Sequence, residues 1–180
     1  MIIAPDYTIE KYGLKARFVV ESDAEFIVKL RTDESLSKYI HSTNSNIDKQ
    51  KEWIRNYKVR EALGQEYYFI FYCNDIPVGL ERIYNITEDT FTHGSLVFSP
   101  DSPIGSSVKA DIITRELGFS VLNKKTNLFD VSKGNNGVIA YHQRYKPTTL
   151  SEDDESYHYS LSKENFEKYK SVYIKIFKMN

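Results

Sequence analysis

The stretch FTHGSLVFSPDSPIGSSVKADIITRELGFSVLNKKTNLFDVSK, residues 91–133, predicts a strand, a break, a helix and a second strand in direct succession. Its first nine residues are typical of a strand, and Pro100, Pro103 and Gly105 then interrupt the chain. Apolar side chains return at helical spacing at Val108, Ile112, Ile113 and Leu117. Because a strand–helix–strand succession is typical of α/β proteins, this stretch decides the fold class.

The sequence on either side extends the same pattern. We expect further strands at residues 12–20, 67–73, 76–86 and 155–162, and further helices at 22–31, 45–63, 135–146 and 163–178. The acidic run TLSEDDESYH, Thr149 to His158, is predicted to be a solvated turn. The whole order predicts an α/β fold, with a mixed central sheet flanked by helices and an amphipathic helix at the C-terminus.

Composition narrows the class of protein. The chain has 180 residues, 41% of them hydrophobic, which fits one globular domain. A net charge of −1 lacks the basic excess of a nucleic-acid-binding protein. The single cysteine, Cys73, excludes an internal disulfide, and no apolar run approaches the roughly 20 residues of a membrane span. The first residues, MIIAPDYTIE, have no basic segment typical of a secretory signal, so we expect a cytoplasmic protein.

The order of elements resembles the GNAT acyl-CoA N-acyltransferase fold over roughly residues 12–162. IPVGLERIYNI resembles the family's hairpin strand, GSLVFSPD its central strand, and VSKGNNGVIAYHQRYKP its asparagine segment. KLRTDESLSKYI and YYFIFYCNDIPVG look closest to the enzymes that acetylate amino groups on nucleotide-linked sugars in bacterial surface-polysaccharide pathways. The resemblance implies one domain over residues 1–180, with residues 163–179 as a C-terminal helix.

Two stretches depart from the family's pattern. The cofactor loop of the family is usually Q/R-x-x-G-x-G/A, whereas this chain has DSPIGSS, with Gly105 as the one remaining glycine. The asparagine segment ends in Lys-Pro rather than Gly-Phe, and the usual tyrosine becomes His142 if Asn135 is the family's asparagine. These departures leave open a degenerate GNAT-fold protein that binds a ligand without catalysis.

The resemblance implies that acetyl-CoA is the co-substrate and that no metal takes part. A helix N-terminus offers free N–H groups to a pyrophosphate, although serines at such a position also cap helices that bind nothing. The backbone of the central strand is expected to pair with pantetheine. The residues assigned to acetyl-CoA are Leu96, Val97, Phe98, Ile104, Gly105, Ser106, Ser107, Asn135 and Tyr141.

Two histidines are the predicted catalytic residues. His93, on the central strand, is expected to help deprotonate the amine, because neutral imidazole accepts a proton near neutral pH. His142 stands where the family often has its tyrosine acid, and is expected to protonate the leaving thiolate. Tyr141 points about 100° away on the same helix, so both side chains are not expected to serve one site. A solvent-facing His93 and a core His142 are the alternatives.

The acceptor site is expected beside the first two helices. The residues assigned to the substrate are Arg31, Tyr39, Glu81 and Arg82, with His41 and Asn44 in the same region. Arg31 suits a diphosphate, or it is a cation at a helix C-terminus. Glu81 and Arg82 face the cleft or form a surface pair, and Trp53 is expected in the core rather than against a base or sugar.

These residues predict a small-molecule amine as substrate, with no nucleic acid or membrane as partner. The four histidines show no metal-ligand spacing, and the chain has no phosphate-binding GxGxxG or P-loop motif. Acetylation of a protein or peptide N-terminus is the alternative chemistry. The aromatic side of the C-terminal helix packs on the domain, or it pairs two chains as a homodimer or scaffold.

Overall fold

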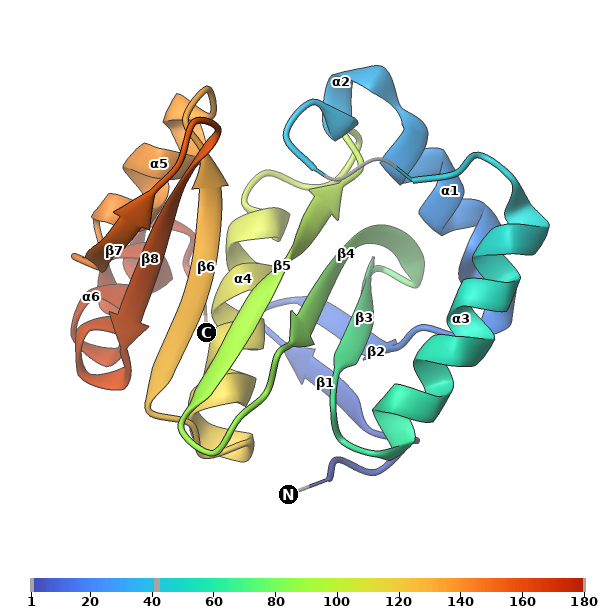
Figure 1. Cartoon of the computed structure of the whole chain (residues 1–180), viewed down its shortest axis with the longest axis horizontal. Coiled ribbons are helices and arrows are strands. Elements are labelled where there is room, and N and C mark those ends of the chain that lie inside the picture. Colours follow the sequence, from blue (N-terminus) through green and yellow to red (C-terminus); the bar gives the residue numbers. More distant parts are fainter. Residues whose placement is uncertain (1, 41–42, 180) are drawn as a thin grey trace.

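An eight-stranded mixed sheet organises the chain in the computed structural model, which describes residues 2–40 and 43–179. The strand order is β1-β2-β3-β4-β5-β6-β8-β7, and every neighbouring pair is antiparallel except β5 and β6 (Figure 1). The strands are β1 (Thr8–Lys11), β2 (Leu14–Phe18), β3 (Tyr67–Cys73), β4 (Ile76–Tyr84), β5 (Thr90–Phe98), β6 (Thr126–Ser132), β7 (Thr148–Glu152) and β8 (Ser156–Ser162).

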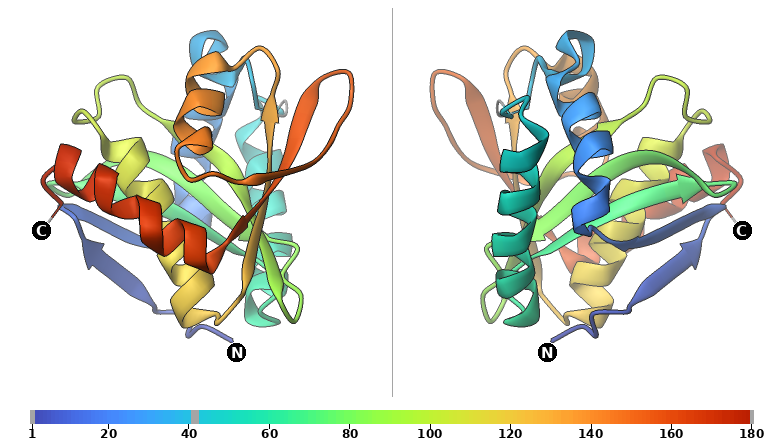
Figure 2. Two further views of the ribbon diagram at one scale, coloured as in Figure 1. Left: turned by 90° about the vertical axis from the view of Figure 1, so that its left-hand side faces the viewer. Right: turned by 90° about the vertical axis from the view of Figure 1, so that its right-hand side faces the viewer.

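Helices cover both faces of this sheet, and each face has its own apolar core. The helices are α1 (Ala24–Thr32), α2 (Glu34–Ser37), α3 (Ile47–Ala62), α4 (Ser106–Glu116), α5 (Asn136–Gln143) and α6 (Lys163–Ile176). In Figure 2, α1 and α3 lie on one face while α4 and α6 lie on the other. Ile27, Ile54 and Tyr57 pack under α1 and α3, and Ile112, Phe119 and Phe166 pack on the opposite face.

The prediction of an α/β fold with a mixed sheet is confirmed, and the structure adds three elements. Strand β1 and the short helix α2 had no predicted counterpart, and β7 begins the acidic run that was predicted to be a turn. All five residues of β7 are exposed, so the strand lacks the apolar alternation by which sequence reveals a strand. No helix within residues 2–40 and 43–179 is long and apolar enough to cross a bilayer.

Strands β5 and β6 part after a short parallel contact. Pairing joins Thr90–Thr92 to Thr126–Leu128 and stops there, and the two strands separate towards their ends in Figure 1. On its other edge, β5 bulges at the residues opposite Glu81, because Leu80 pairs with Val97 while Arg82 pairs with Gly94. Both irregularities leave backbone groups of β5 without strand partners, which makes this the point of the sheet suited to a ligand.

Candidate active site

The two predicted catalytic histidines meet where β5 and β6 part. His93 is the first residue of β5 beyond the last parallel pair, and Phe129 is the corresponding residue of β6. The ring of His142, from α5, lies 4.6 Å from the ring of Phe129 and 6.0 Å from that of His93. Each histidine is only 6% exposed, so a solvent-facing His93 is excluded. The burial of His142 also fits the alternative of a core histidine, so the catalytic role of both side chains stays a prediction.

An ion pair on α4 lies directly against these histidines. Oδ2 of Asp111 is 3.2 Å from Nε of Arg115, one helical turn away, and both side chains are sealed from solvent. Oδ1 of Asp111 is 3.0 Å from Nε2 of His93, and a terminal nitrogen of Arg115 is 2.9 Å from Nδ1 of His142. One carboxylate and one guanidinium thus connect the two histidines, which come from different elements.

The buried charges set the protonation of this cluster. Burial lowers the pKa of His93 and, more strongly, that of His142, and Arg115 lowers both further. Burial alone would raise the pKa of Asp111, but Arg115 and the His93 contact outweigh it and hold that pKa below its usual range. At neutral pH the cluster therefore contains a charged Asp111–Arg115 pair and two neutral imidazoles.

Glu81 adds an acid to the cluster from β4. Its Oε2 accepts a hydrogen bond of 2.7 Å from the hydroxyl of Thr114, and it is completely buried. Burial, with Asp111 nearby, raises the pKa of Glu81 well above its usual range. One ligand atom from each of Glu81, His93 and Asp111 lies within 4.8 Å of the others. The guanidinium of Arg115, 3.2 Å from Oδ2 of Asp111, already neutralises one of these carboxylates and would repel a divalent cation.

Tyr141 joins the same cluster, which corrects the prediction that it and His142 would point to different places. Its hydroxyl donates to Oδ2 of Asp111 over 2.6 Å, while His142 contacts Arg115. The two rings lie 4.9 Å apart. Although adjacent helical residues diverge by about 100°, these long side chains reach opposite ends of the Asp111–Arg115 pair.

The predicted cofactor loop ends at an uncapped helix. Gly105 is the N-cap residue of α4 with a left-handed φ of 85°, and no side chain caps the helix. Both the backbone N–H and the hydroxyl of Ser106 bond to the carbonyl of Pro103. Within the described residues, the N–H groups of Ser107 and Val108 have no acceptor, so they remain available to an anion. Ile104 lies beside them and is 94% exposed.

The C-terminal helix supports this loop from the other side. A Cβ added to Gly105 would lie 2.4 Å from the ring of Phe177, just beyond the end of α6. Only glycine fits here, both because of its φ and because the ring fills the space that a side chain needs.

The remaining predicted cofactor residues lie beside the opening between β5 and β6. Leu96 and Phe98 are half-buried and Val97 is buried, all on the part of β5 beyond its pairing with β6. Asn135 caps α5, because its side-chain oxygen accepts from the N–H of Val138. The predicted cap is thus present, and a contact between Asn135 and a cofactor stays a prediction.

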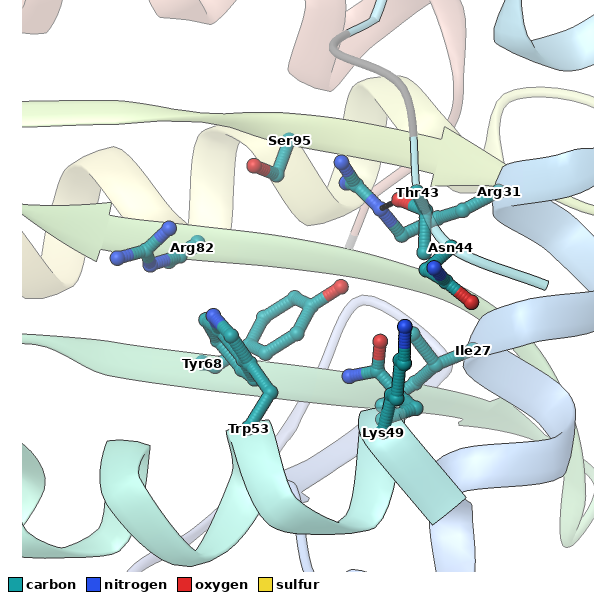
Figure 3. Close-up of a pocket in the computed structure, with 10 residues that line it drawn as sticks. Ile27, Arg31, Thr43, Asn44, Lys49, Trp53, Tyr68, Arg82 and Ser95 are labelled. Carbon is teal, nitrogen blue, oxygen red and sulfur yellow. Dashed lines mark hydrogen bonds between the residues drawn. The ribbon is translucent and has the colours of Figure 1, made fainter. Parts of the chain in front are cut away.

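A cavity of about 340 Å³ lies on the opposite face of the sheet, between α1, α3 and the strands. It is lined by Ile27, Arg31, Thr43, Asn44, Lys49, Gln50, Trp53, Tyr68, Arg82 and Ser95. Figure 3 shows Trp53, Tyr68 and Arg82 close together, with Arg31, Asn44 and Lys49 at the other end. Among the described lining residues there are three cations and no carboxylate, so the cavity suits an anionic ligand.

Two lining side chains are already held in place. Nε of Arg31 donates to the hydroxyl of Thr43 over 2.6 Å, and Arg82 forms an ion pair with Glu66. The guanidinium of Arg82 also lies 5.4 Å from the ring of Trp53, so the aromatic wall and the cation support each other. Trp53 is half-buried and lines the cavity, which corrects its predicted place inside the core.

Tyr68 brings an unpaired hydroxyl to this cavity. The side chain is 3% exposed, and its hydroxyl has no hydrogen-bond partner among the described residues. The hydroxyl points towards the end of the cavity where Arg31 and Lys49 lie (Figure 3). Burial raises the pKa of Tyr68, against the effect of Arg31 and Arg82, so the group stays a neutral donor. A buried hydroxyl without a partner favours a ligand that accepts its hydrogen bond.

Comparison with known proteins assigns the family. No family model and no curated protein matches the sequence. A solved structure titled "Apo FdhC- a nucleotide-linked sugar GNAT" is 35% identical, with a TM-score of 0.83 over 93% of this chain and 97% of that one. This chain belongs to the GNAT family. Its fold also resembles Campylobacter jejuni N-acetyltransferase PseH, at 19% identity and a TM-score of 0.64 over 84% of this chain and 99% of that one.

Another GNAT structure shows the same fold with a bound cofactor. Spermidine N-acetyltransferase from Vibrio cholerae, in complex with CoA and spermine, has a TM-score of 0.74 and 14% identity over 86% of this chain and 98% of that one. The predicted family and enzyme class are therefore confirmed: the chain is a GNAT acyltransferase, and its fold fits acetyl transfer to an amine.

The predicted acceptor residues of this GNAT enzyme do not all meet. Arg31 and Arg82 line the cavity, whereas Tyr39 lies at 39% exposure and donates to the carbonyl of Gly134, just before α5. Glu81 faces α4 rather than the cavity, because neighbouring residues of a strand point to opposite faces. A shared cleft or surface pair for Glu81 and Arg82 is therefore wrong. His41 lies outside the described residues.

Three candidate functional residues, Asp111, Arg115 and Tyr68, were not predicted from the sequence. Asp111 and Arg115 stand four residues apart on α4, a spacing that also describes many exposed ion pairs. Tyr68 sits in an apolar strand run in which every second side chain enters one core or the other. Nothing in the sequence marks its hydroxyl as unpaired, because this depends on which helices cover the strand.

Proposed function

We propose that this enzyme transfers an acetyl group from acetyl-CoA to a primary amine on a nucleotide-linked amino sugar. The observation that carries the proposal is the cavity on the α1–α3 face, where Arg31, Lys49 and Arg82 accompany Trp53 and Tyr68. Cationic side chains suit a diphosphate, and an aromatic wall suits a planar base or the apolar face of a sugar. The 35% identity with a nucleotide-linked sugar GNAT supports the same acceptor class.

The charge of the cavity argues against a polyamine acceptor. Spermidine acetyltransferases share the fold at 12–14% identity, which speaks only for the architecture. A polyamine carries several positive charges and would meet Arg31 and Lys49, as well as Arg82 with its partner Glu66, with no carboxylate among the described lining residues. An acceptor with negative charge on its carrier and a single amine fits the cavity better.

Two features support acetyl-CoA as the donor. The free N–H groups of Ser107 and Val108 at the start of α4 suit a pyrophosphate, and Gly105 lets the loop approach it closely. The edge of β5 beyond Thr92 has no strand partner, so its backbone can pair with the amides of pantetheine. Donor and acceptor then reach the bulge of β5 from opposite faces of the sheet.

Direct transfer requires one bond to form, one to break and one proton to move. The amine nitrogen attacks the thioester carbonyl carbon, the carbon–sulfur bond breaks, and the proton lost by nitrogen ends on the thiolate sulfur. We propose that His93 accepts that proton on Nδ1, which has no partner among the described residues, whereas its Nε2 is held between Oδ1 of Asp111 and a terminal nitrogen of Arg115. Asp111 in turn stabilises the imidazolium that forms.

A calorimetric titration followed by an acceptor panel tests this function. Purified protein should bind acetyl-CoA with micromolar affinity and one site per chain, with free CoA as the comparison ligand. CoA release should then depend on a nucleotide-linked amino sugar, and not on spermidine or a peptide N-terminus. Absence of acetyl-CoA binding at millimolar concentration would leave a non-catalytic binder, and release with the peptide alone would identify a protein acetyltransferase.

The proposed product also suggests a cellular setting. An acetylated nucleotide sugar is a precursor of surface polysaccharide, so we place the enzyme in the cytoplasm of a bacterium, where such precursors form. Acetyl-CoA and the amine suffice for the reaction without a metal. Sedimentation analysis would show whether the enzyme works as a homodimer.

A further inference from the structure

Arg115 is buried at the centre of the molecule with unusual neighbours. It is completely sealed from solvent, and its guanidinium carbon lies 5.0 Å from the ring centroids of both Phe129 and Tyr145. Asp111 balances its charge, but one terminal nitrogen also extends past this partner to Nδ1 of His142, at 2.9 Å, and to Nε2 of His93, at 3.3 Å. A buried arginine that only stabilised the helix would not need this second contact.

The hydrogen bond between Arg115 and His142 fixes the position of a proton. A guanidinium can only donate hydrogen bonds, so Nδ1 of His142, 2.9 Å away, must be the acceptor. A neutral imidazole carries its one proton on the other nitrogen when Nδ1 accepts. His142 therefore carries its proton on Nε2, and protonation of Nδ1 would place two donors against each other.

The protonated nitrogen is the one that a substrate can reach. Among the described residues Nε2 of His142 has no partner, and it is not one of the buried side-chain atoms without a partner. The remaining 6% exposure of this residue thus includes a nitrogen accessible to solvent. His142 packs on Phe129, next to the last β5–β6 pair, so its ring lies beside the opening proposed for the acyl group.

We propose that Arg115 is a positioning residue that holds His142 as a neutral imidazole with its proton on Nε2. His142 then donates a hydrogen bond to the oxygen of the thioester carbonyl, where negative charge develops as the amine attacks. This inference rests on the proposed acyl transfer for the role of His142, but the state of the ring is a property of the free protein. It replaces the predicted role of His142 as an imidazolium acid.

The surroundings of the ring oppose a positive charge on it. The charged and titratable groups that contact the ring or its neighbours are Arg115 and Asp111 from α4, His93 from β5, Glu81 from β4, Tyr141 from α5, Tyr145 just after α5, Tyr159 from β8 and Tyr173 from α6. The charge of Asp111, whose pKa is held low, is balanced by Arg115. Burial and Arg115 hold the pKa of His142 well below its usual range, in agreement with this geometry.

Nitrogen NMR on the full chain, labelled with ¹⁵N-histidine and free of substrates, tests the state of the ring. Long-range ¹H–¹⁵N correlations distinguish the two neutral tautomers and the imidazolium, and single His→Gln variants assign the signals. We expect His142 to show protonated Nε2 and bare Nδ1 from about pH 8 down to about pH 6. A signal from protonated Nδ1, or from imidazolium at neutral pH, would overturn the proposal.

Two substitutions test whether Arg115 is the cause. Arg115→Met removes the donor, so both tautomers of His142 should appear and the ring should begin to protonate as the pH falls towards 6. Arg55→Met, which removes an exposed arginine from α3, should leave the His142 signal unchanged. An unchanged tautomer in Arg115→Met contradicts the proposal. If Arg115→Met does not fold, the wild-type spectrum alone decides whether His142 carries its proton on Nε2.

Kinetics then separate this role from a structural one. In Arg115→Met, kcat should fall about tenfold or more while the KM values change little, and kcat should acquire a new dependence on pH below neutrality. A loss confined to KM, or a pH profile identical to that of the wild type, would indicate that Arg115 only supports the fold. If the protein proves to have no acyl transfer, the NMR result is unaffected, so the two failures can be distinguished.

Discussion

Nε2 of His93 lies 3.0 Å from Oδ1 of Asp111, in a part of the molecule almost sealed from solvent. The carboxylate therefore orients the imidazole and stabilises any proton that it gains. The same carboxylate is the counter-ion of Arg115, so this one side chain influences both histidines. Its removal should affect stability and catalysis together.

Asp111→Asn should destabilise the fold by about 3–5 kcal/mol, because the substitution leaves the buried charge of Arg115 without a counter-ion. Urea unfolding at neutral pH measures the effect. Asp75→Asn is the matched control, since Asp75 forms an exposed ion pair of 3.3 Å with Lys15. That control should change stability by less than about 1 kcal/mol. Similar small effects for both variants would show that the buried ion pair is absent.

Glu81→Gln should stabilise the protein more at alkaline than at acidic pH. The raised pKa of Glu81 means that the folded state binds a proton that the unfolded chain releases above about pH 4.3. The wild type therefore loses stability as the pH rises from that value towards the raised pKa, whereas glutamine has no proton to lose. Unfolding of both proteins at about pH 5 and pH 8 measures the difference, and equal differences at the two values would contradict the assignment.

Gly105→Ala should destabilise the protein more than Gly13→Ala. Both glycines have a positive φ, 85° and 76°, but a Cβ on Gly105 meets the ring of Phe177 whereas a Cβ on Gly13 meets nothing within 4 Å. The excess should be about 1–3 kcal/mol and should disappear in a Phe177→Ala background. The same variant should raise KM for acetyl-CoA by displacing the loop. An excess that persists without Phe177 would refute the contact.

Tyr68→Phe should weaken acceptor binding without loss of stability. Its hydroxyl has no partner among the described residues, so its removal should leave stability unchanged or slightly higher. KM for the acceptor should rise by about two- to tenfold, with KM for acetyl-CoA unchanged. Tyr57→Phe is the contrasting variant, because the hydroxyl of Tyr57 donates to Glu61 and accepts from the N–H of Tyr68. That variant should cost about 1–3 kcal/mol of stability.

The order of helices and strands could be predicted because most of them carry apolar side chains at helical or strand spacing. Strand β7 was not readable, since it is an edge strand whose five residues are all exposed and which pairs only with β8. Strand β1 was not predicted for the same reason, because none of the residues Thr8–Lys11 is buried. Edge strands that bury no side chain leave no period in the sequence.

The candidate site was predictable only in part. The family's spacing marked His93 and His142, and the structure brings them to the parting of β5 and β6. The family's spacing could not identify Asp111 and Arg115, because their role depends on tertiary contacts. From α4, Asp111 contacts His93 on β5, and Arg115 contacts His142 on α5. Glu81 was predicted on the same side as Arg82, but neighbouring residues of a strand point to opposite faces of the sheet. The bulge of β5 also shifts the β4–β5 register at this point, which the sequence does not reveal.

The most direct test of the account compares two acceptors that differ only in the nucleotide. CoA release from acetyl-CoA is followed with a nucleotide-linked amino sugar and with the same amino sugar free of its nucleotide, and mass spectrometry confirms the acetylated amine. We expect a kcat/KM at least about a hundredfold higher for the nucleotide-linked sugar, because the cations and aromatic wall of the cavity bind the carrier. Equal values for the two acceptors, or faster release with spermidine, would contradict it.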